Sequence, residues 1–169
     1  FWESEAKHCI ADVKVTANDW NAGGFVGYIE DNVTIHNCIS YGDVHSKVNG
    51  WKPNVGGFTG ISNPNCSIDN SHAAGKVTAE STDYKAGGFV GYDNGGTVTS
   101  CSYDAKKNPE LKGVGETETA GTNSILPQDN VLSIICTAYY GNHDWDESKE
   151  IIKEKPTAVK EGSKGYLCK

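Results

Sequence analysis

The chain has 169 residues and a formal net charge of −7, with 15 basic residues that are all lysine. Arginine makes the bidentate contacts to phosphates and base edges, so an acidic chain without arginine is not expected to bind nucleic acid. No stretch approaches the roughly 18 consecutive apolar residues of a membrane helix, so we expect no membrane span.

One block of sequence recurs three times, as Ala22–Tyr28, Val55–Ile61 and Ala86–Tyr92. Its starts at residues 22, 55 and 86 are 33 and 31 residues apart. A unit of this length cannot bury its own apolar face and must stack on copies of itself.

Within each repeat, apolar residues alternate with polar ones, as Val33 and Ile35 do with Thr34 and His36. A period of two over short runs bounded by Gly, Asn and Asp predicts strands. The sequence therefore predicts an all-β fold: a short, right-handed parallel β-solenoid of about three coils, each with roughly three strands. A β-sandwich is the competing fold, but it does not require a repeat of this length.

Stacked coils place equivalent residues one above another, about 4.8 Å apart. The expected columns are Phe25/Phe58/Phe89, Ile35/Ile68/Val98 and Val15/Val44/Val77. The recurring Gly-Gly pair suits either a corner with positive φ or a close approach of backbones.

The repeats occupy residues 1–104, and residues 105–169 are expected to form a linking loop and a C-terminal cap that covers the open end of the solenoid. The loop is placed at residues 105–123. Apolar residues at 131, 132, 135 and 138–139 predict a short helix within residues 124–140, with Gly141 as its C-cap and a strand as the alternative. Residues 145–169 suit a short hairpin or a loose wrap.

The six cysteines do not show zinc-site spacing. Stacked neighbours have parallel Cα–Cβ vectors, which is poor geometry for a disulfide, so the cysteines of the repeats are expected to be small buried thiols. A disulfide between Cys136 and Cys168, which lie outside the repeats, is left as an alternative. In chain order the six are Cys9, Cys38, Cys66, Cys101, Cys136 and Cys168.

No catalytic residue is assigned. The five histidines are expected at the surface or in turns, with no column of imidazoles. For Asp144–Glu147, a solvated turn is a better interpretation than a calcium site, because the usual loop spacing of oxygen ligands is missing. A polysaccharide-active enzyme would need paired carboxylates, but most candidate aspartates lie beside Asn or Gly in predicted turns. The candidates are Asp31, Asp43, Asp69, Asp83, Asp93 and Asp104. We expect no cofactor and no metal.

Three aromatic residues precede the Gly-Gly-Phe blocks by three to five residues: Trp20, Trp51 and Tyr84. They are expected to form a row along one edge of the solenoid. Such rows bind the faces of sugars or a protein partner. The equal alternative is that they only cover apolar coil edges.

The Gly-Gly-Phe-Val-Gly block, followed by Asn-Cys-Ile-Ser-Tyr-Gly-Asp-Val at residues 37–44, resembles the GLUG repeat of bacterial surface proteins, with Phe where Leu is usual. The resemblance covers about residues 8–104. It implies a repeat module of a larger exported protein, such as those found in some immunoglobulin A proteases outside the catalytic part.

The sequence contains no methionine, so we expect it to be part of a longer chain. The function expected is a non-catalytic spacer or adhesive module at the bacterial cell surface or outside the cell. Its expected partners are neighbouring domains and, in the alternative function as a binding module, a glycan or a host or matrix protein.

Overall fold

The computed structural model describes residues 4–18, 20–48, 52–119, 121–129, 145–154 and 163–168. The chain divides into two compact units, Phe1–Ile135 and Cys136–Lys169. Every regular element in the described part of the first unit is a β-strand, and all of its strand pairs are parallel, as the sequence predicts.

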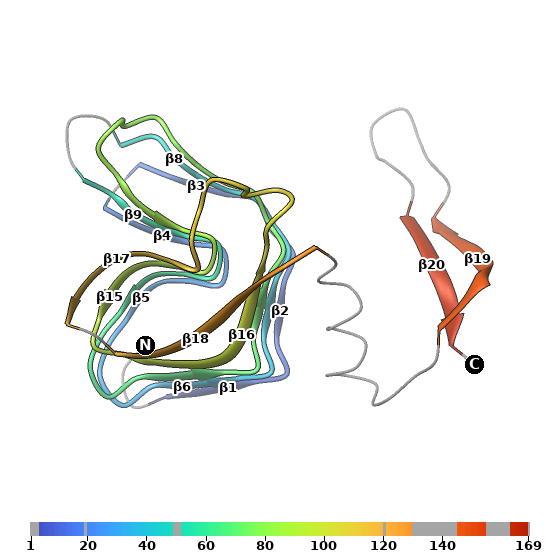
Figure 1. Ribbon diagram of the computed structural model, residues 1–169, viewed down its shortest axis with the longest axis horizontal. Helices are drawn as coiled ribbons and strands as arrows, with labels where there is room; N and C mark the ends of the chain where they lie inside the picture. Colours follow the sequence, from blue (N-terminus) through green and yellow to red (C-terminus); the bar gives the residue numbers. More distant parts are fainter. Residues whose placement is uncertain are drawn as a thin grey trace. The chain divides into compact units, whose positions relative to one another are not determined.

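The first unit is a stack of coils that follow one another along the chain (Figure 1). A partial coil contains β1 (Glu5–Lys7), β2 (Ile10–Ala11) and β3 (Val15–Ala17). The next coil contains β4 (Asn21–Gly23), β5 (Val26–Ile29), β6 (Thr34–His36), β7 (Ile39–Ser40) and β8 (Val44–Ser46). This coil thus has five short strands, more than the roughly three expected.

The second full coil repeats this order with β9 (Asn54–Gly56), β10 (Thr59–Ser62), β11 (Ser67–Asp69), β12 (His72–Ala73) and β13 (Val77–Ala79). The third contains β14 (Lys85–Gly87), β15 (Val90–Asn94) and the long β16 (Thr97–Asp104), which pairs with both β11 and β12. Equivalent strands form parallel sheets in the orders β14-β9-β4, β13-β8-β3 and β15-β10-β5, with β1, β2, β6, β7, β11, β12 and β16 in a larger sheet.

The expected columns of side chains are confirmed. Ile35, Ile68 and Val98 are in register, as are Val15, Val44 and Val77. The rings of Phe25 and Phe58 stack with centroids 4.8 Å apart and planes at 7°, and those of Phe58 and Phe89 stack at 4.6 Å and 5°. These separations match the spacing of neighbouring strands, so the stack follows directly from the register.

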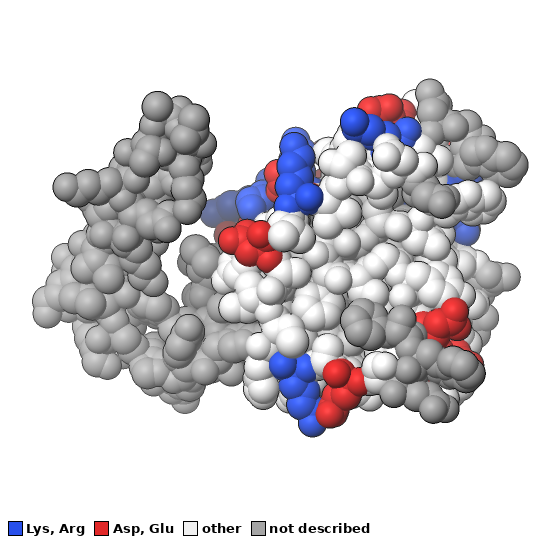
Figure 2. Space-filling model, turned by 180° about the vertical axis from the view of Figure 1, so that it is seen from behind, with Lys and Arg blue, Asp and Glu red and all other residues white. Residues whose placement is uncertain are grey.

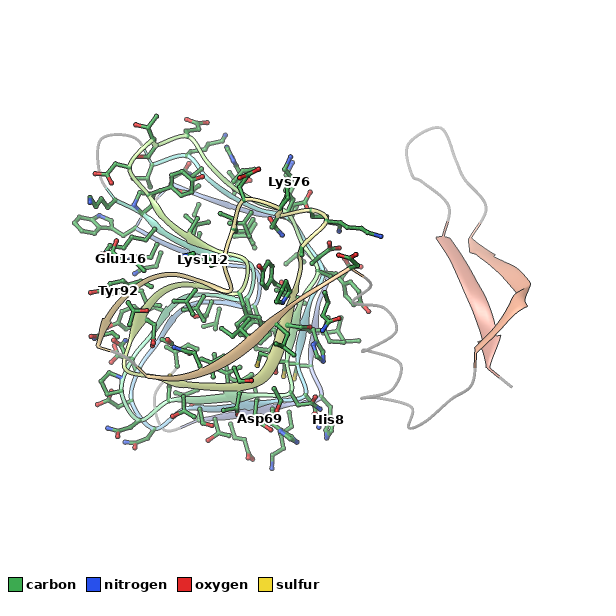
Figure 3. All side chains as sticks on the ribbon, in the orientation of Figure 1. His8, Asp69, Lys76, Tyr92, Lys112 and Glu116 are labelled. Carbon is green, nitrogen blue, oxygen red and sulfur yellow. The ribbon has the colours of Figure 1, made fainter. Side chains whose placement is uncertain are left out.

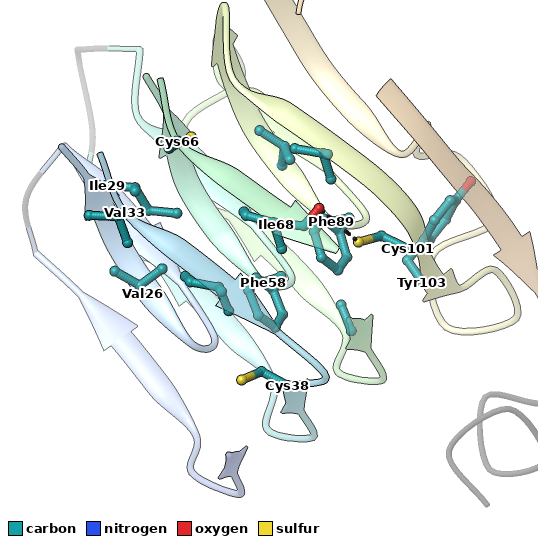
Figure 4. Packing of buried hydrophobic residues seen from close by; sticks show 14 residues of the cluster. Val26, Ile29, Val33, Cys38, Phe58, Cys66, Ile68, Phe89, Cys101 and Tyr103 are labelled. Atoms are coloured by element: carbon teal, nitrogen blue, oxygen red, sulfur yellow. Dashed lines mark hydrogen bonds between the residues drawn. The ribbon is translucent and has the colours of Figure 1, made fainter. Parts of the chain in front are cut away.

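The coil encloses two apolar cores. The larger contains the phenylalanine stack and lies among the strands equivalent to β5, β6 and β7 (Figure 4). The smaller lies between the sheets of β8 and β9 and contains Ala22, Val44, Val55 and Val77. The outline of each coil therefore has two lobes (Figure 1).

The glycines of the repeat serve close approach. A Cβ added to Gly57 would lie 2.2 Å from the carbonyl oxygen of Gly88 in the next coil, and one added to Gly60 would lie 2.4 Å from that of Gly27. Among the described glycines, only Gly95 has a positive φ. Of the two expected reasons for the Gly-Gly pair, the structure therefore selects close packing of backbones.

Asparagine occupies several corners that need positive φ. Asn32 and Asn65 both have φ of 60°, and Asn37 and Asn70 have φ of 53° and 44°. Asparagine tolerates this left-handed region better than most residues. The side-chain amide of Asn70 donates to that of Asn37 in the coil before, so the corners also bind one coil to the next.

The stacking continues beyond residue 104, which corrects the expected linking loop at residues 105–123. Strand β17 (Val114–Thr119) pairs with β15, and β18 (Thr122–Gln128) pairs with β16, each with a register shift. Residues 124–128 thus belong to a strand and do not begin the expected helix. The apolar stripe at 131–139 lies outside the described residues.

In the second unit, β19 (Trp145–Glu154) pairs antiparallel with β20 (Ser163–Cys168). This pairing agrees with the hairpin that was one of the two arrangements expected for residues 145–169.

Candidate binding surface

Two residues of the predicted aromatic row, Trp20 and Tyr84, lie in one column of the stack. The backbone N–H of Asn54 donates to the carbonyl of Trp20 at 2.7 Å, and that of Lys85 donates to the carbonyl of Pro53 at 2.9 Å. Trp20, Pro53 and Tyr84 are therefore equivalent in successive coils. Trp20 is 53 % and Tyr84 40 % exposed. Trp51 lies outside the described residues, so the row of three remains a prediction.

A second column of large side chains was missed by the sequence analysis. Tyr28, Ile61 and Tyr92 are in register on β5, β10 and β15. Tyr28 is exposed, and Tyr92 lies on the same side of the molecule as Glu116 of β17 (Figure 3). The signal was present in the repeated block itself, whose last residue is Tyr, Ile and Tyr in turn.

A lysine connects the two columns in the third coil. The ammonium of Lys85, the residue after Tyr84, lies 3.6 Å from the centre of the Tyr92 ring and 3.2 Å from Glu116 Oε1. The equivalents of Lys85 in the two earlier coils are Asn21 and Asn54, whose side-chain amides form a hydrogen bond of 2.7 Å. Asn54 is buried, so this surface offers mainly the exposed aromatic rings of Trp20, Tyr28 and Tyr84, which are suited to sugar faces or to protein side chains.

The histidines take different roles. The sequence placed all of them at the surface or in turns, and this is wrong for His72, which is 2 % exposed. Its Nδ1 lies 2.8 Å from Ser102 Oγ, and burial lowers the pKa of His72 to about 4. A neutral, buried imidazole in the position of Ile39 acts as a core residue.

His36 is half-buried and lies in register with Asp69, as expected. Its Nδ1 is 2.7 Å from both oxygens of the Asp69 carboxylate. The ring of His8 meets the ring of His36 edge to face, with centroids 6.1 Å apart. His8 and Asp69 lie on the outer side of the sheet of β1 and β6 (Figure 3).

Several candidate carboxylates accept hydrogen bonds from backbone N–H groups, as their position beside Asn or Gly in turns predicts. Asp43 Oδ1 accepts from the N–H of Lys76 at 2.8 Å, and Asp104 Oδ1 accepts from that of Lys107 at 3.0 Å. Asp93 is fully buried and accepts hydrogen bonds from the side chains of Ser62 and Asn123 and from the backbone N–H groups of Gly95, Gly96 and Gly121. Such a saturated carboxylate joins the third coil to β18 and has little capacity left for catalysis.

The described cysteines are free thiols. Cys38, Cys66 and Cys101 are buried, as expected, whereas Cys9 is exposed. Burial raises the pKa of Cys38 and Cys66 to about 11 and that of Cys101 to about 12, so these thiols stay protonated and unreactive at neutral pH. Cys136 and the side chain of Cys168 lie outside the described residues.

Within the ranges that the structure describes, no group of three or more His, Cys, Asp or Glu side chains is arranged to hold a metal ion. The calcium alternative at Asp144–Glu147 falls on side chains outside these ranges. Nor do the described residues include a helix long and apolar enough to cross a membrane.

Comparisons of the chain with protein-family models, curated proteins and solved structures found no match.

Proposed function

We propose that this chain is a non-catalytic scaffold module of a bacterial surface or secreted protein, which separates neighbouring domains and presents repeated loops. The resemblance of its repeats to GLUG motifs motivates the location. The observation that supports the scaffold role is the continuous stack of Phe25, Phe58 and Phe89, with both interplanar angles at 7° or below. Coils held in one register form a rod whose length grows with the number of coils.

The test is a replacement experiment in the parent protein. Residues 4–129 are replaced by an unrelated solenoid of the same length along its axis, and surface exposure of the flanking domains is measured by antibody labelling of intact cells. A spacer predicts unchanged labelling and function. A shorter replacement, lacking one coil, should reduce the reach of the outer domain. Loss of function with the length-matched replacement would contradict the scaffold role, and failure to label intact cells would contradict the location.

The second candidate is a binding module for a glycan or a host or matrix protein. It is favoured by the shared column of Trp20 and Tyr84, which lie two coils, or roughly 10 Å, apart. The variant Trp20→Ala/Trp51→Ala/Tyr84→Ala is compared with the unchanged chain on glycan and matrix-protein arrays. Binding that disappears in the variant supports this function; binding that persists shows that the row is not the site.

A further inference from the structure

The turns that precede β6 and β11 carry a motif that the scaffold function does not use. Of the asparagines in the sequence, only Asn32 and Asn65 have a Thr or Ser two residues later, in Asn-Val-Thr at 32–34 and Asn-Cys-Ser at 65–67. Neither motif has Pro in the middle, so both match the acceptor sequence for an N-linked glycan. Such a match gains weight only where the fold exposes the asparagine at the surface.

The structure places both asparagines at the same corner of successive coils. Thr34 and Ser67 are in register at the starts of β6 and β11, so Asn32 and Asn65 are equivalent. Both asparagines have φ of 60° and both are exposed, whereas the residue that follows each of them is buried. The corner therefore holds the middle residue of the motif in the core and leaves the asparagine in contact with solvent.

The exposure of this corner does not depend on where the stack begins. Asn65 has a described coil on each side, because β11 pairs with β6 and with β16. Its equivalents are Asn32 in the coil before and Gly95 in the coil after, and Asn65 is nevertheless exposed. Gly95 has no side chain, so the later coil places none beside Asn65. A bulky group on the Asn65 amide therefore has room on that side.

A second column of asparagines shows what the side chain does when it serves the stack. Asn37 and Asn70 also have positive φ, but the amide of Asn70 donates to that of Asn37, and neither has a Ser or Thr two residues later. In the part of the chain that the structure describes, the side chains of Asn32 and Asn65 form no such hydrogen bond. Their amide nitrogens are therefore free to carry a glycan.

An ionic docking site would be another use of an exposed corner, but it needs charges of one sign gathered together. On the face that Figure 2 shows, the Lys, Asp and Glu side chains of the described residues stand in small separate groups, mostly near the margin. The described part of this face thus offers no continuous charged patch to a partner, which favours modification over ionic docking.

We propose that Asn32 and Asn65 are acceptor sites for N-linked glycans. In the transfer, the amide nitrogen of Asn forms a bond to C1 of a sugar, and the bond from C1 to the diphosphate of a lipid carrier breaks. The diphosphate leaves with the electron pair, and the amide nitrogen loses one proton to solvent. The co-substrate is thus a sugar carried on a lipid diphosphate. The proposal rests on export of the chain, which is part of the proposed function.

The first experiment uses the whole chain, secreted with an added export signal from a cell that attaches N-linked glycans. The purified protein is treated in heavy-oxygen water with an amidase that removes these glycans and converts each glycosylated Asn into labelled Asp. Mass spectrometry of its peptides then locates the label. We expect label at Asn32 and Asn65 and none at Asn37 or Asn70. Label at neither acceptor, or equal label at all four, would overturn the proposal.

Matched variants test the motif without straining the turn. Thr34→Val and Ser67→Ala remove the hydroxyl and keep the asparagine, whereas Thr97→Val makes the same kind of change in the third coil, where Gly95 stands in place of the asparagine. Circular dichroism checks that all three variants are folded. We expect Thr34→Val and Ser67→Ala each to remove the mass of one glycan and Thr97→Val to leave the mass unchanged. A full glycan mass in the first two variants would contradict the acceptor motif.

A last measurement separates this proposal from the proposed function. The parent protein is purified from the surface of its native cells after antibody labelling, and Asn32 and Asn65 are mapped in the same way. Glycans at both sites support the proposal. Unmodified asparagines on a protein that does reach the surface would overturn the proposal and leave the scaffold function standing.

Discussion

The two ends of the described coil stack differ in the side chains that bind their strand edges. At the C-terminal edge of the β13-β8-β3 sheet, the side-chain amide of Asn108 takes the place of a peptide group of a further coil: it accepts from the N–H of Val77 at 2.8 Å and donates to the carbonyl of Gly75 at 2.9 Å. Lys107 Nζ donates to the carbonyl of Ala74 at 2.6 Å. At the other end, the described residues show the β4 and β5 edges without a comparable side chain.

The repeat therefore specifies only the middle of the stack. Any coil built from the repeat leaves hydrogen-bonding groups for the next one, so closure must come from residues that depart from the repeat. Residues 103–111 do this: the Tyr103 ring packs on Gly88, and its hydroxyl donates to the carbonyl of Leu111 at 2.8 Å.

Removing a ring from the middle of the stack should cost more than removing one from the first layer. Phe58→Ala is expected to lower the free energy of unfolding by about 3–5 kcal/mol, because a completely buried ring leaves a cavity. Phe25→Ala should cost about half as much, because one ring face is already open. Urea unfolding measures both. Equal losses would show that the first layer is as enclosed as the middle.

The column of Ile10, Ile39, His72 and Ser102 is apolar at the first layer and polar at the last, which predicts a dependence on pH. The pKa of His72 is lowered from 6.5 to about 4 by burial, so the folded chain disfavours the protonated form. The contribution of neutral His72 to the free energy of unfolding is complete above pH 6.5. It is lost as the pH falls from 6.5 towards 4, by about 3 kcal/mol in total.

The measurement for His72 is the free energy of unfolding between pH 4 and 7. The variant His72→Ile, which copies the residue of the preceding coil, should show a smaller loss over this range. The same loss in the variant would assign the pH dependence to other groups.

Asn108 should contribute more to the free energy of unfolding than its position in a loop suggests. Asn108→Ala removes the hydrogen bonds to Val77 and Gly75 and leaves buried backbone groups unpaired, so we expect a loss of about 2–3 kcal/mol in unfolding free energy. Asn108→Asp keeps the acceptor for Val77. Its free energy of unfolding, measured by chemical denaturation, should lie between those of the unchanged chain and Asn108→Ala. An unaffected Asn108→Ala variant would show that this end needs no side-chain closure.

The ion pair on β1 should affect association more than stability. Glu5 and Lys7 are about half exposed, so Lys7→Ala should change the free energy of unfolding by less than ~1 kcal/mol. Removing an edge charge should nevertheless increase aggregation, measured by light scattering at rising protein concentration. The exposed pair of Lys52 and Asp83 supplies the control, because Asp83→Ala leaves the β1 edge unchanged. Equal aggregation of both variants would contradict an edge effect.

Much of the fold was predictable because the repeat is a local signal. The spacing of the Gly-Gly-Phe blocks predicts which residues are equivalent, and equivalence alone places Phe25, Phe58 and Phe89 in one column. The sequence analysis missed the extension by β17 and β18, because residues 114–128 no longer carry the block. A polar stretch rich in Gly and Thr is typical of a loop. Here it forms strands because its backbone pairs with the edges of β15 and β16.

The candidate surface was predictable only in part. Trp20 and Tyr84 stood out as aromatic residues at similar places in the repeat, and the structure gives them equivalent backbone positions. The neighbouring column of Tyr28, Ile61 and Tyr92 was hidden, because strand alternation alone did not show which residues of the block face outward.

The sequence by itself determined the all-β repeat, its period and its columns, because equal spacing along the chain forces equal positions in a stack. Only the tertiary structure decided that the glycines serve close backbone contact, that His72 is buried and that Asn108 covers the edge of β13. Each of these depends on atoms about 30 residues away along the chain, and no local pattern states which groups will meet there.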